Sequence, residues 1–410
     1  MKANSFFEAW NGFFFAEQSP IPLVLFRVAY GTAVIATLFL LHGDWIAWYG
    51  PDAWVRLSTI RAMEPGPRLN LFTMIPPSDS WVRILFWVFL VSAVCLTIGL
   101  FTRVNSILVF VCLASIQQRN LLILHGGDTF LRVTGFFLMF APAGAALSVD
   151  RLIRIWRGKE GVEIQPCRPW AQRMIQFELA LLYFAGFCSK IEGGSWVQGT
   201  ALYYVYHLDE LERFPIPPWF FHPVILRLAT WFALALEFSM GVLIWIKELR
   251  YPLLAVGVLF HLSLEYSLNI PMFQWDVLSA YILFVDPADL KRFWNGICTR
   301  ADRYFSEQIN VVYDGASERR RRIANVLRAI DIFGRLSFAD LRNSHTQFDA
   351  TCQDVQNKFL VATSSGLLRG RDGLRAIAGV VPLLWPLALL LRIQQLWTPR
   401  IAASTKSGDA

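Results

Sequence analysis

The end of one apolar segment carries a lysine and a glutamate that could take part in proton transfer. Lys190 and Glu192 follow residues 177–188, in which Glu178 is the only charge. An ammonium at the edge of hydrocarbon is costly unless it reaches water or a partner, so Lys190 is a candidate functional residue. A lysine that is removed from water can act as a general base. The alternative is that Lys190 extends to the lipid headgroups beside Glu192.

Two further pairs of ionisable residues are spaced by about one helical turn. Asp128 and Arg132 follow the glycine pair 126–127, and His261 and Glu265 lie in a later apolar segment. Residues at i and i+4 share one face of a helix, so each pair could orient a substrate or relay a proton. The alternative is that these groups form structural hydrogen bonds inside a helix bundle.

Long apolar blocks indicate the class of protein. The 410 residues are 55% hydrophobic and 15% aromatic, with a mean hydropathy of +0.42, which is typical of a polytopic membrane protein. The net charge of +7 is concentrated in a few loops and in the C-terminal third, so it indicates topology, with membrane lipids and not nucleic acid as the partner. The six cysteines form no CxxC pair, so the sequence predicts no metal site and no disulfide framework.

We predict a mostly α-helical bundle that crosses the membrane about eight times, preceded by an interfacial segment over residues 1–20. Basic loops alternate with the acidic residues 209–212, which places both termini in the cytoplasm. The first loop, with Arg56, Arg61 and Arg68, is the exception to this rule. The expected spans begin at residues 21, 82, 106, 174, 224, 251 and 272, with a further span within residues 117–144, and the bundle ends near residue 290.

The C-terminal part has the pattern of a small α/β domain. After a linker over residues 291–308, the sequence predicts a strand (INVVYDG), an amphipathic helix (SERRRRIANVLRAID) and a second strand (GRLSFADLRN). Residues 376–391 are apolar but contain Pro382 and Pro386, so they are expected to pack on the domain or on the bilayer surface. Residues 401–410 are predicted to be a disordered tail.

Residues 20–290 resemble the HTTM membrane domain, the bacterial relatives of vitamin K-dependent gamma-glutamyl carboxylase. The resemblance rests on Arg27, on the GGDTFLR run, on YFAGFCSKIEGGSWVQGTALYY, on the helix of His261 and on MFQWDVLSAYILFVDP. It implies that Lys190 is the base that activates a reduced quinone, and that the protein lies in the bacterial inner membrane. Ser189 stands where the carboxylase has a second lysine, and the large lumenal domain has no counterpart here, which argues against peptide carboxylation.

Residues 309–400 resemble the DCC family, whose thioredoxin-like fold carries an Asp-x-x-Cys-x-x-Cys motif after its first strand. Asp314 matches the aspartate, whereas Ser317 and Arg320 stand in place of the two cysteines. Without a thiol at these positions, ordinary disulfide exchange is excluded, and the isolated Cys352 cannot replace the pair. The resemblance therefore implies a redox-inactive domain that serves structure, regulation or a protein partner.

The leading hypothesis is a membrane enzyme that uses a quinone-type cofactor, with Lys190 as the base. His261, Asp128 and Arg132 would orient groups or relay protons, and Arg27, Trp196 and Glu265 are assigned to cofactor binding. The competing hypothesis is a scaffold or a lipid- or quinone-binding protein whose polar residues stabilise the bundle. A transporter ranks third, since the two halves show no repeat.

Overall fold

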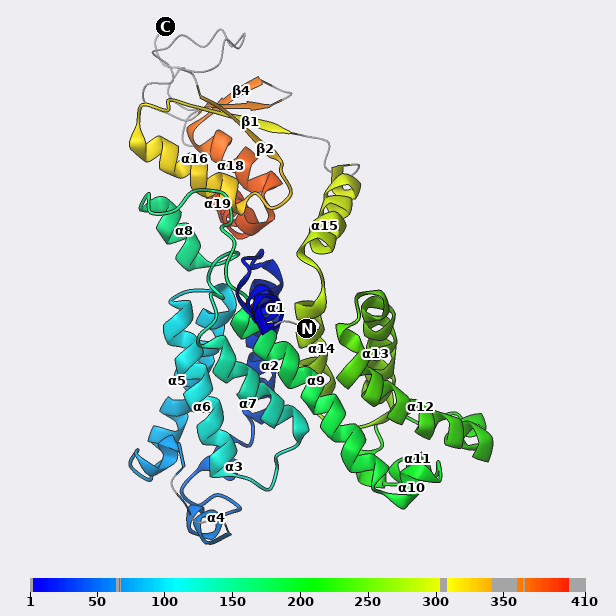
Figure 1. Ribbon diagram of the computed structural model, residues 1–410. Coiled ribbons are helices and arrows are strands. Elements are labelled where there is room, and N and C mark those ends of the chain that lie inside the picture. Colours follow the sequence, from blue (N-terminus) through cyan, green and yellow to red (C-terminus); the bar gives the residue numbers. More distant parts are fainter. Residues whose placement is uncertain are drawn as a thin grey trace, which may run out of the picture. The chain divides into compact units, whose positions relative to one another are not determined.

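The computed structural model describes residues 3–63, 66, 68–302, 308–340, 360–363 and 366–397. The predicted tail over 401–410 and Cys352 lie outside these residues. The chain divides into two compact units, Met1–Asp150 with Ile164–Leu290, and Arg151–Glu163 with Lys291–Ala410. The helical first unit and the small sheet of the second are both seen in Figure 1.

Four helices of the first unit are long and apolar enough to cross a membrane, counting only the described residues. They confirm that the chain is an integral membrane protein. Several start at positions where the sequence provides a cap or a proline: Ser78 caps α5, and Pro22 and Pro223 lie in the first turns of α2 and α12. The four spans are α2 (Ile21–Leu41), α5 (Asp79–Ile98), α9 (Trp170–Ile191) and α12 (Pro223–Val242) with η4 (Leu243–Trp245).

Other helices pack around these spans and share one apolar core with them. The polar residues 117–119 do continue the third predicted span as helix, whereas the eighth is interrupted after Tyr281. The remaining elements of the first unit are α1 (Ala3–Phe15), α3 (Trp45–Tyr49), α4 (Leu57–Met63), η1 (Leu71–Thr73), α6 (Thr102–Arg119), α7 (Gly126–Leu138), α10 (Gly194–Val197), α11 (Ala201–Val205), η2 (Asp209–Leu211), η3 (Pro218–Phe221), α13 (Lys247–Ser267), α14 (Phe273–Tyr281) and η5 (Ile282–Phe284).

Two short backbone bridges join segments that are distant in sequence. Gln18 and Cys167 exchange both of their backbone hydrogen bonds, at 3.0 and 2.9 Å, just before α2 and α9 begin. Glu212 forms a second antiparallel bridge with Leu268, which follows the end of α13. These bridges fix the ends of helices against each other without any side-chain chemistry.

The second unit contains a mixed sheet of four strands in the order β2-β1-β3-β4. β1 is parallel to β2, and β3 is antiparallel to both β1 and β4. Its core is apolar and includes Ile309, Val311, Val361 and Ile377. The strands are β1 (Ile309–Tyr313), β2 (Leu336–Asp340), β3 (Leu360–Thr363) and β4 (Gly366–Arg369), and the helices are α16 (Glu318–Ile330), α18 (Gly370–Val380), η6 (Pro382–Leu384) and α19 (Trp385–Trp397).

The sequence correctly predicted β1, α16 and β2, but not the residues before them. Residues 291–308 were expected to form a linker, yet α15 (Pro287–Asp302) is helical over most of that range. The polar composition of this segment gives no apolar signal for a helix. Asp286, just before α15, caps its start, because its side chain accepts a hydrogen bond from the Ala288 backbone at 2.8 Å. α8 (Val149–Trp156) likewise belongs from Arg151 onward to the second unit, where Leu152 packs against the core.

Candidate functional site

A cavity of about 820 Å³ lies in the first unit and has mostly apolar walls. Residues from α9, α11, α12, α13 and α14 line it, and aromatic rings of Phe220, Phe232, Phe260 and Phe273 form much of the wall. Its volume lies within the range of sites that bind small organic molecules. The ionisable side chains on this wall are therefore the best candidates for chemistry.

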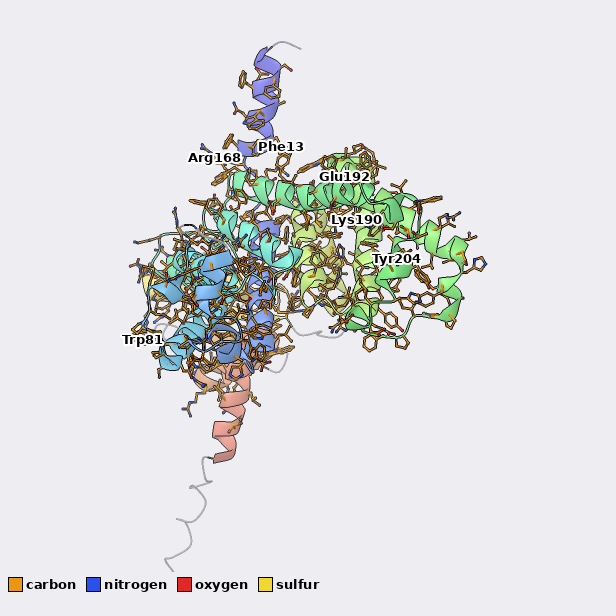
Figure 2. The ribbon with its side chains drawn as sticks, turned by 90° about the horizontal axis from the view of Figure 1, so that it is seen from below. Phe13, Trp81, Arg168, Lys190, Glu192 and Tyr204 are labelled. Atoms are coloured by element: carbon orange, nitrogen blue, oxygen red, sulfur yellow. The ribbon has the colours of Figure 1, made fainter. Side chains whose placement is uncertain are left out.

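Lys190 forms an ion pair with Glu237 at the wall of this cavity. The side chains are 30% and 11% exposed, so the carboxylate is the more deeply buried partner. Lys190 also lies 5.3 Å from the ring centroid of Trp196, a distance suited to a cation–π contact. Glu192 is exposed, and the partner of Lys190 is Glu237, so the ion pair joins α9 to α12. Figure 2 labels Lys190 and Glu192 near the end of α9.

Gly186 brings the backbone of α9 close to this ion pair. A Cβ atom at Gly186 would lie 3.4 Å from Oε2 of Glu237 and 3.6 Å from Nζ of Lys190. That Oε2 atom is buried and accepts no hydrogen bond from the described residues. A larger side chain at this position would therefore fill the space beside the free carboxylate oxygen.

His261 lies at the centre of a buried hydrogen-bonded chain. Its Nε2 atom contacts the Tyr183 hydroxyl, and its Nδ1 atom contacts the amide oxygen of Gln274. The Tyr183 hydroxyl also lies 2.6 Å from that of Tyr281. With the amide oxygen of Gln274 facing Nδ1, the hydrogen is assigned to Nδ1, and Nε2 of the neutral ring accepts one from Tyr183. His261 is thus held in one tautomer at 2% exposure.

Two polar residues of the cavity wall, Tyr183 and Lys190, lie on one face of α9. Tyr183, Gly186 and Lys190 are spaced i, i+3 and i+7, and all three line the cavity. Seven residues of helix span about 10 Å, so Tyr183 and Lys190 are too far apart to exchange a proton directly. A molecule that fills the cavity could contact both groups.

The predicted pairing of His261 with Glu265 is wrong. Glu265 instead forms an ion pair with Arg213, which comes from the loop before α12. The bridge between Glu212 and Leu268 brings this arginine to the end of α13, nearly two turns beyond His261. Glu265 does not line the larger cavity, so its assignment to cofactor binding has no support from the geometry.

The predicted pairing of Asp128 with Arg132 is also wrong. Asp128 lies in the first turn of α7, where its Oδ2 atom accepts a hydrogen bond from the His125 backbone at 2.9 Å. Asp128 caps the start of α7 and does not pair with Arg132, because the backbone amides at a helix start are otherwise unpaired. Among the described residues, Arg132 has no carboxylate within 4 Å, and it lines neither described cavity.

Arg27 has a structural role and does not line the cavities. It is 0% exposed, and it donates hydrogen bonds to the carbonyls of Thr97, Ala143, Ala146 and Leu147 at 2.6 to 3.5 Å. Gly99 ends α5 next to it with φ at 72°, and a Cβ atom there would lie 2.7 Å from Nη1 of Arg27. Arg27 therefore joins α2 to the ends of α5 and of the segment after α7.

Several residues of the site were missed because helical spacing within one segment cannot reveal contacts between segments. Glu237 and Gln274 were visible as polar residues in apolar helices, which is the signal that could have identified them. Tyr183 and Tyr281 gave no signal, since tyrosine is common in membrane helices at the interface.

In the second unit, Ser317 and Arg320 lie at the start of α16. Ser317 precedes the first helical residue, and Arg320 lies 3.4 Å from the carboxylate of Asp314. An arginine side chain of α16 thus pairs with the aspartate that follows β1.

Comparison with known proteins gives one match. The HTTM domain family matches residues 15–288, which is more than half of the chain. No curated protein and no solved structure matches. The matched range contains both cavities and every residue of the Lys190–Glu237 and His261 clusters, and it ends before β1, so it does not include the four-stranded sheet. The chain therefore belongs to the HTTM domain family.

Proposed function

We propose that this membrane protein binds a lipid-soluble compound of the quinone class in the larger cavity and that Lys190 acts there as a base. The observation that carries the proposal is the Lys190–Glu237 pair on the wall of an otherwise apolar cavity. An ion pair is an expensive way to line an apolar cavity, because each charge loses hydration. This cost is explained if the charges act on a bound molecule.

The cavity fits a ring that carries an apolar chain. Aromatic walls suit the ring and the chain, and the free Oε2 atom of Glu237 and the Lys190 ammonium suit a phenolic hydroxyl. A reduced quinone would supply acidic hydroxyls and two electrons. Lys190, Glu237 and Trp196 are the residues that would hold its polar end, and the phenylalanines would hold its apolar part.

The ion pair gives the protein a way to generate a base on binding. Lys190 accepts a proton only as the free amine, and Glu237 is hydrogen-bonded to its Nζ atom. A bound apolar molecule excludes water, which favours transfer of the proton from Nζ to the carboxylate, since the neutral pair needs less solvation. Nζ can then take a proton from the bound hydroxyl. The roles of His261 and Tyr183 are to hold or relay a proton at the other end of the cavity.

The test is to purify the protein in native lipid particles and to identify the retained small molecules by mass spectrometry. Wild type is expected to retain a quinone-class compound, and Lys190→Ala is expected to lose it or to change its redox state. Lys247→Ala is the matched control, because Lys247 is exposed and does not line the cavity. If wild type and Lys190→Ala both carry only bulk phospholipid, the proposal is overturned.

A second candidate is a non-catalytic protein that binds a lipid or quinone. The Tyr281–Tyr183–His261–Gln274 chain favours it, because every ring nitrogen of His261 is already engaged in a structural bond. Under this reading Lys190→Ala keeps the ligand and only lowers stability. We also propose a bacterial inner-membrane location with both termini in the cytoplasm, which follows from the basic loops and is testable by reporter fusions at each end.

For the second unit we propose a thioredoxin-like domain that has lost its redox function. The βαβ unit of β1, α16 and β2, followed by the β3–β4 hairpin and α18, supports this proposal. Ser317 and Arg320 cannot exchange disulfides. A role in binding a protein partner is testable by crosslinking from the exposed start of α16.

A further inference from the structure

A second, smaller cavity of about 250 Å³ in the first unit has acceptor oxygens on its wall. Gln117 of α6, Asp128 of α7 and Asp276 of α14 all line it. Gln117 and Asp276 are each only 2% exposed. Oε1 of Gln117 and Oδ1 of Asp276 receive no hydrogen bond from any described residue.

The orientation of Gln117 is fixed by its own amide nitrogen. Its Nε2 atom donates to the backbone carbonyl of Asp128 at 2.7 Å. Rotating the amide so that the nitrogen takes the place of the oxygen would lose this bond. Asp276 has no lysine or arginine within 4 Å among the described residues. The site therefore offers two buried acceptor oxygens that no donor among the described residues pairs with.

The charges at the site favour a monovalent ligand. Asp128 lies in the first turn of α7, where the helix dipole stabilises it, and His125 Nε2 is 3.5 Å from its Oδ2 atom. When it is ionised, Asp276 carries a negative charge that no lysine, arginine or histidine among the described residues balances within 4 Å. Carboxylate and amide oxygens are hard ligands that suit alkali cations better than soft metals.

We propose that the smaller cavity is a binding site for a monovalent alkali cation, held by Asp276, Gln117 and Asp128. The cation supplies the positive charge that the buried oxygens otherwise lack. His125 lines both cavities, so a bound cation would adjoin the wall of the larger one. The site does not depend on the function proposed for Lys190.

The experiment uses the full chain in lipid nanodiscs, with Na⁺ as the probe. Binding of ²²Na⁺ is measured directly, and unfolding is followed by tryptophan fluorescence while NaCl replaces choline chloride at constant ionic strength. Wild type should bind ²²Na⁺ saturably, and its Tm should rise by roughly 2–4 °C for each tenfold increase of Na⁺ above the Kd. Equal Tm values in NaCl and choline chloride, without saturable ²²Na⁺ binding, would overturn the proposal.

Asp276→Asn is the decisive variant, because it removes the charge at almost constant volume. It should abolish ²²Na⁺ binding and the Na⁺ effect on Tm, and in choline chloride it should be at least as stable as wild type. The matched control is Asp79→Asn, an exposed carboxylate at the start of α5, which should bind ²²Na⁺ normally. Retention of Na⁺ binding by Asp276→Asn would contradict the proposal. A wild-type Tm that changes with pH but not with Na⁺ would contradict it as well.

Gln117→Met keeps the result interpretable if Asp276→Asn does not fold. It removes one ligand oxygen and leaves both carboxylates, so the apparent affinity for Na⁺ should fall by about tenfold. An unchanged affinity would mean that the amide oxygen of Gln117 does not contact the ion, and the proposed site would be wrong.

Discussion

Lys190 of α9 forms its ion pair with Glu237 of α12 and not with Glu192, its near neighbour in the sequence. The pair links two helices that pack along each other, and it lies where they line the larger cavity. Figure 1 shows α9 extending from the helices of the bundle toward α10 and α11. The packing of α9 against α12, and not closeness in the sequence, thus determines the partner of Lys190.

Replacement of Glu237 by Gln should destabilise the protein more than removal of both charges. The single variant leaves the Lys190 ammonium beside apolar walls without a counter-ion, at a cost of about 1–3 kcal/mol after allowance for its partial exposure. Lys190→Met with Glu237→Leu should recover most of this loss. The measurement is a double-mutant cycle on unfolding in nanodiscs, and strictly additive effects would show that the two side chains do not interact.

Tyr183→Phe should lower the free energy of unfolding by about 1–3 kcal/mol. The change removes the hydroxyl that bonds both His261 and Tyr281, and it leaves buried polar atoms without partners. Tyr204→Phe is the control, since Tyr204 is 62% exposed and should have an effect near zero. The measurement is chemical unfolding of wild type, Tyr183→Phe and Tyr204→Phe. Equal effects of the two substitutions would show that this chain of hydrogen bonds does not stabilise the fold.

Arg27→Lys should reduce folding yield and stability strongly, by about 3 kcal/mol or more, without acting on ligand binding per folded molecule. Lysine cannot reproduce the forked contacts to four carbonyls, so buried acceptors are left unpaired. Arg83→Lys on the exposed side of α5 should be neutral. A folded Arg27→Lys protein that specifically loses the quinone-class ligand would restore the original assignment of Arg27 to cofactor binding.

Cys167 should react slowly with iodoacetamide in the folded protein. Burial raises the pKa of this thiol, and the nearby Glu17 carboxylate raises it further. The folded state therefore favours the neutral thiol, so this contribution to stability is complete below the unfolded pKa of about 8.5 and is lost as pH rises through the folded value. Alkylation quantified by peptide mass spectrometry between pH 7 and 10 tests this, and equal rates in folded and denatured protein would contradict it.

The long apolar helices could be predicted from the sequence because their length, composition and caps are local features of each segment. α2 begins at Ile21, where the sequence predicts the start of the first span, and Ser78 before α5 is a local cap. The site could be predicted only in part. Lys190, His261 and Trp196 were identified as polar or aromatic residues and do line the cavity, but their partners come from other helices. Spacing by four residues suggested the wrong partners for His261 and Asp128, because contacts between helices and capping of a helix start outweighed neighbours on one face.

The bridge between Gln18 and Cys167 constrains how the chain is threaded through the bilayer. These residues directly precede α2 and α9, and their backbone bonds require both helices to enter from the same side. The number of crossings between them must then be even. Since α2 and α5 make two, α6 and α7 must either both cross or both remain on one side. The bridge between Glu212 and Leu268 imposes the same parity on α12 and α13, so the two backbone bridges exclude a topology with an odd number of passes in either stretch.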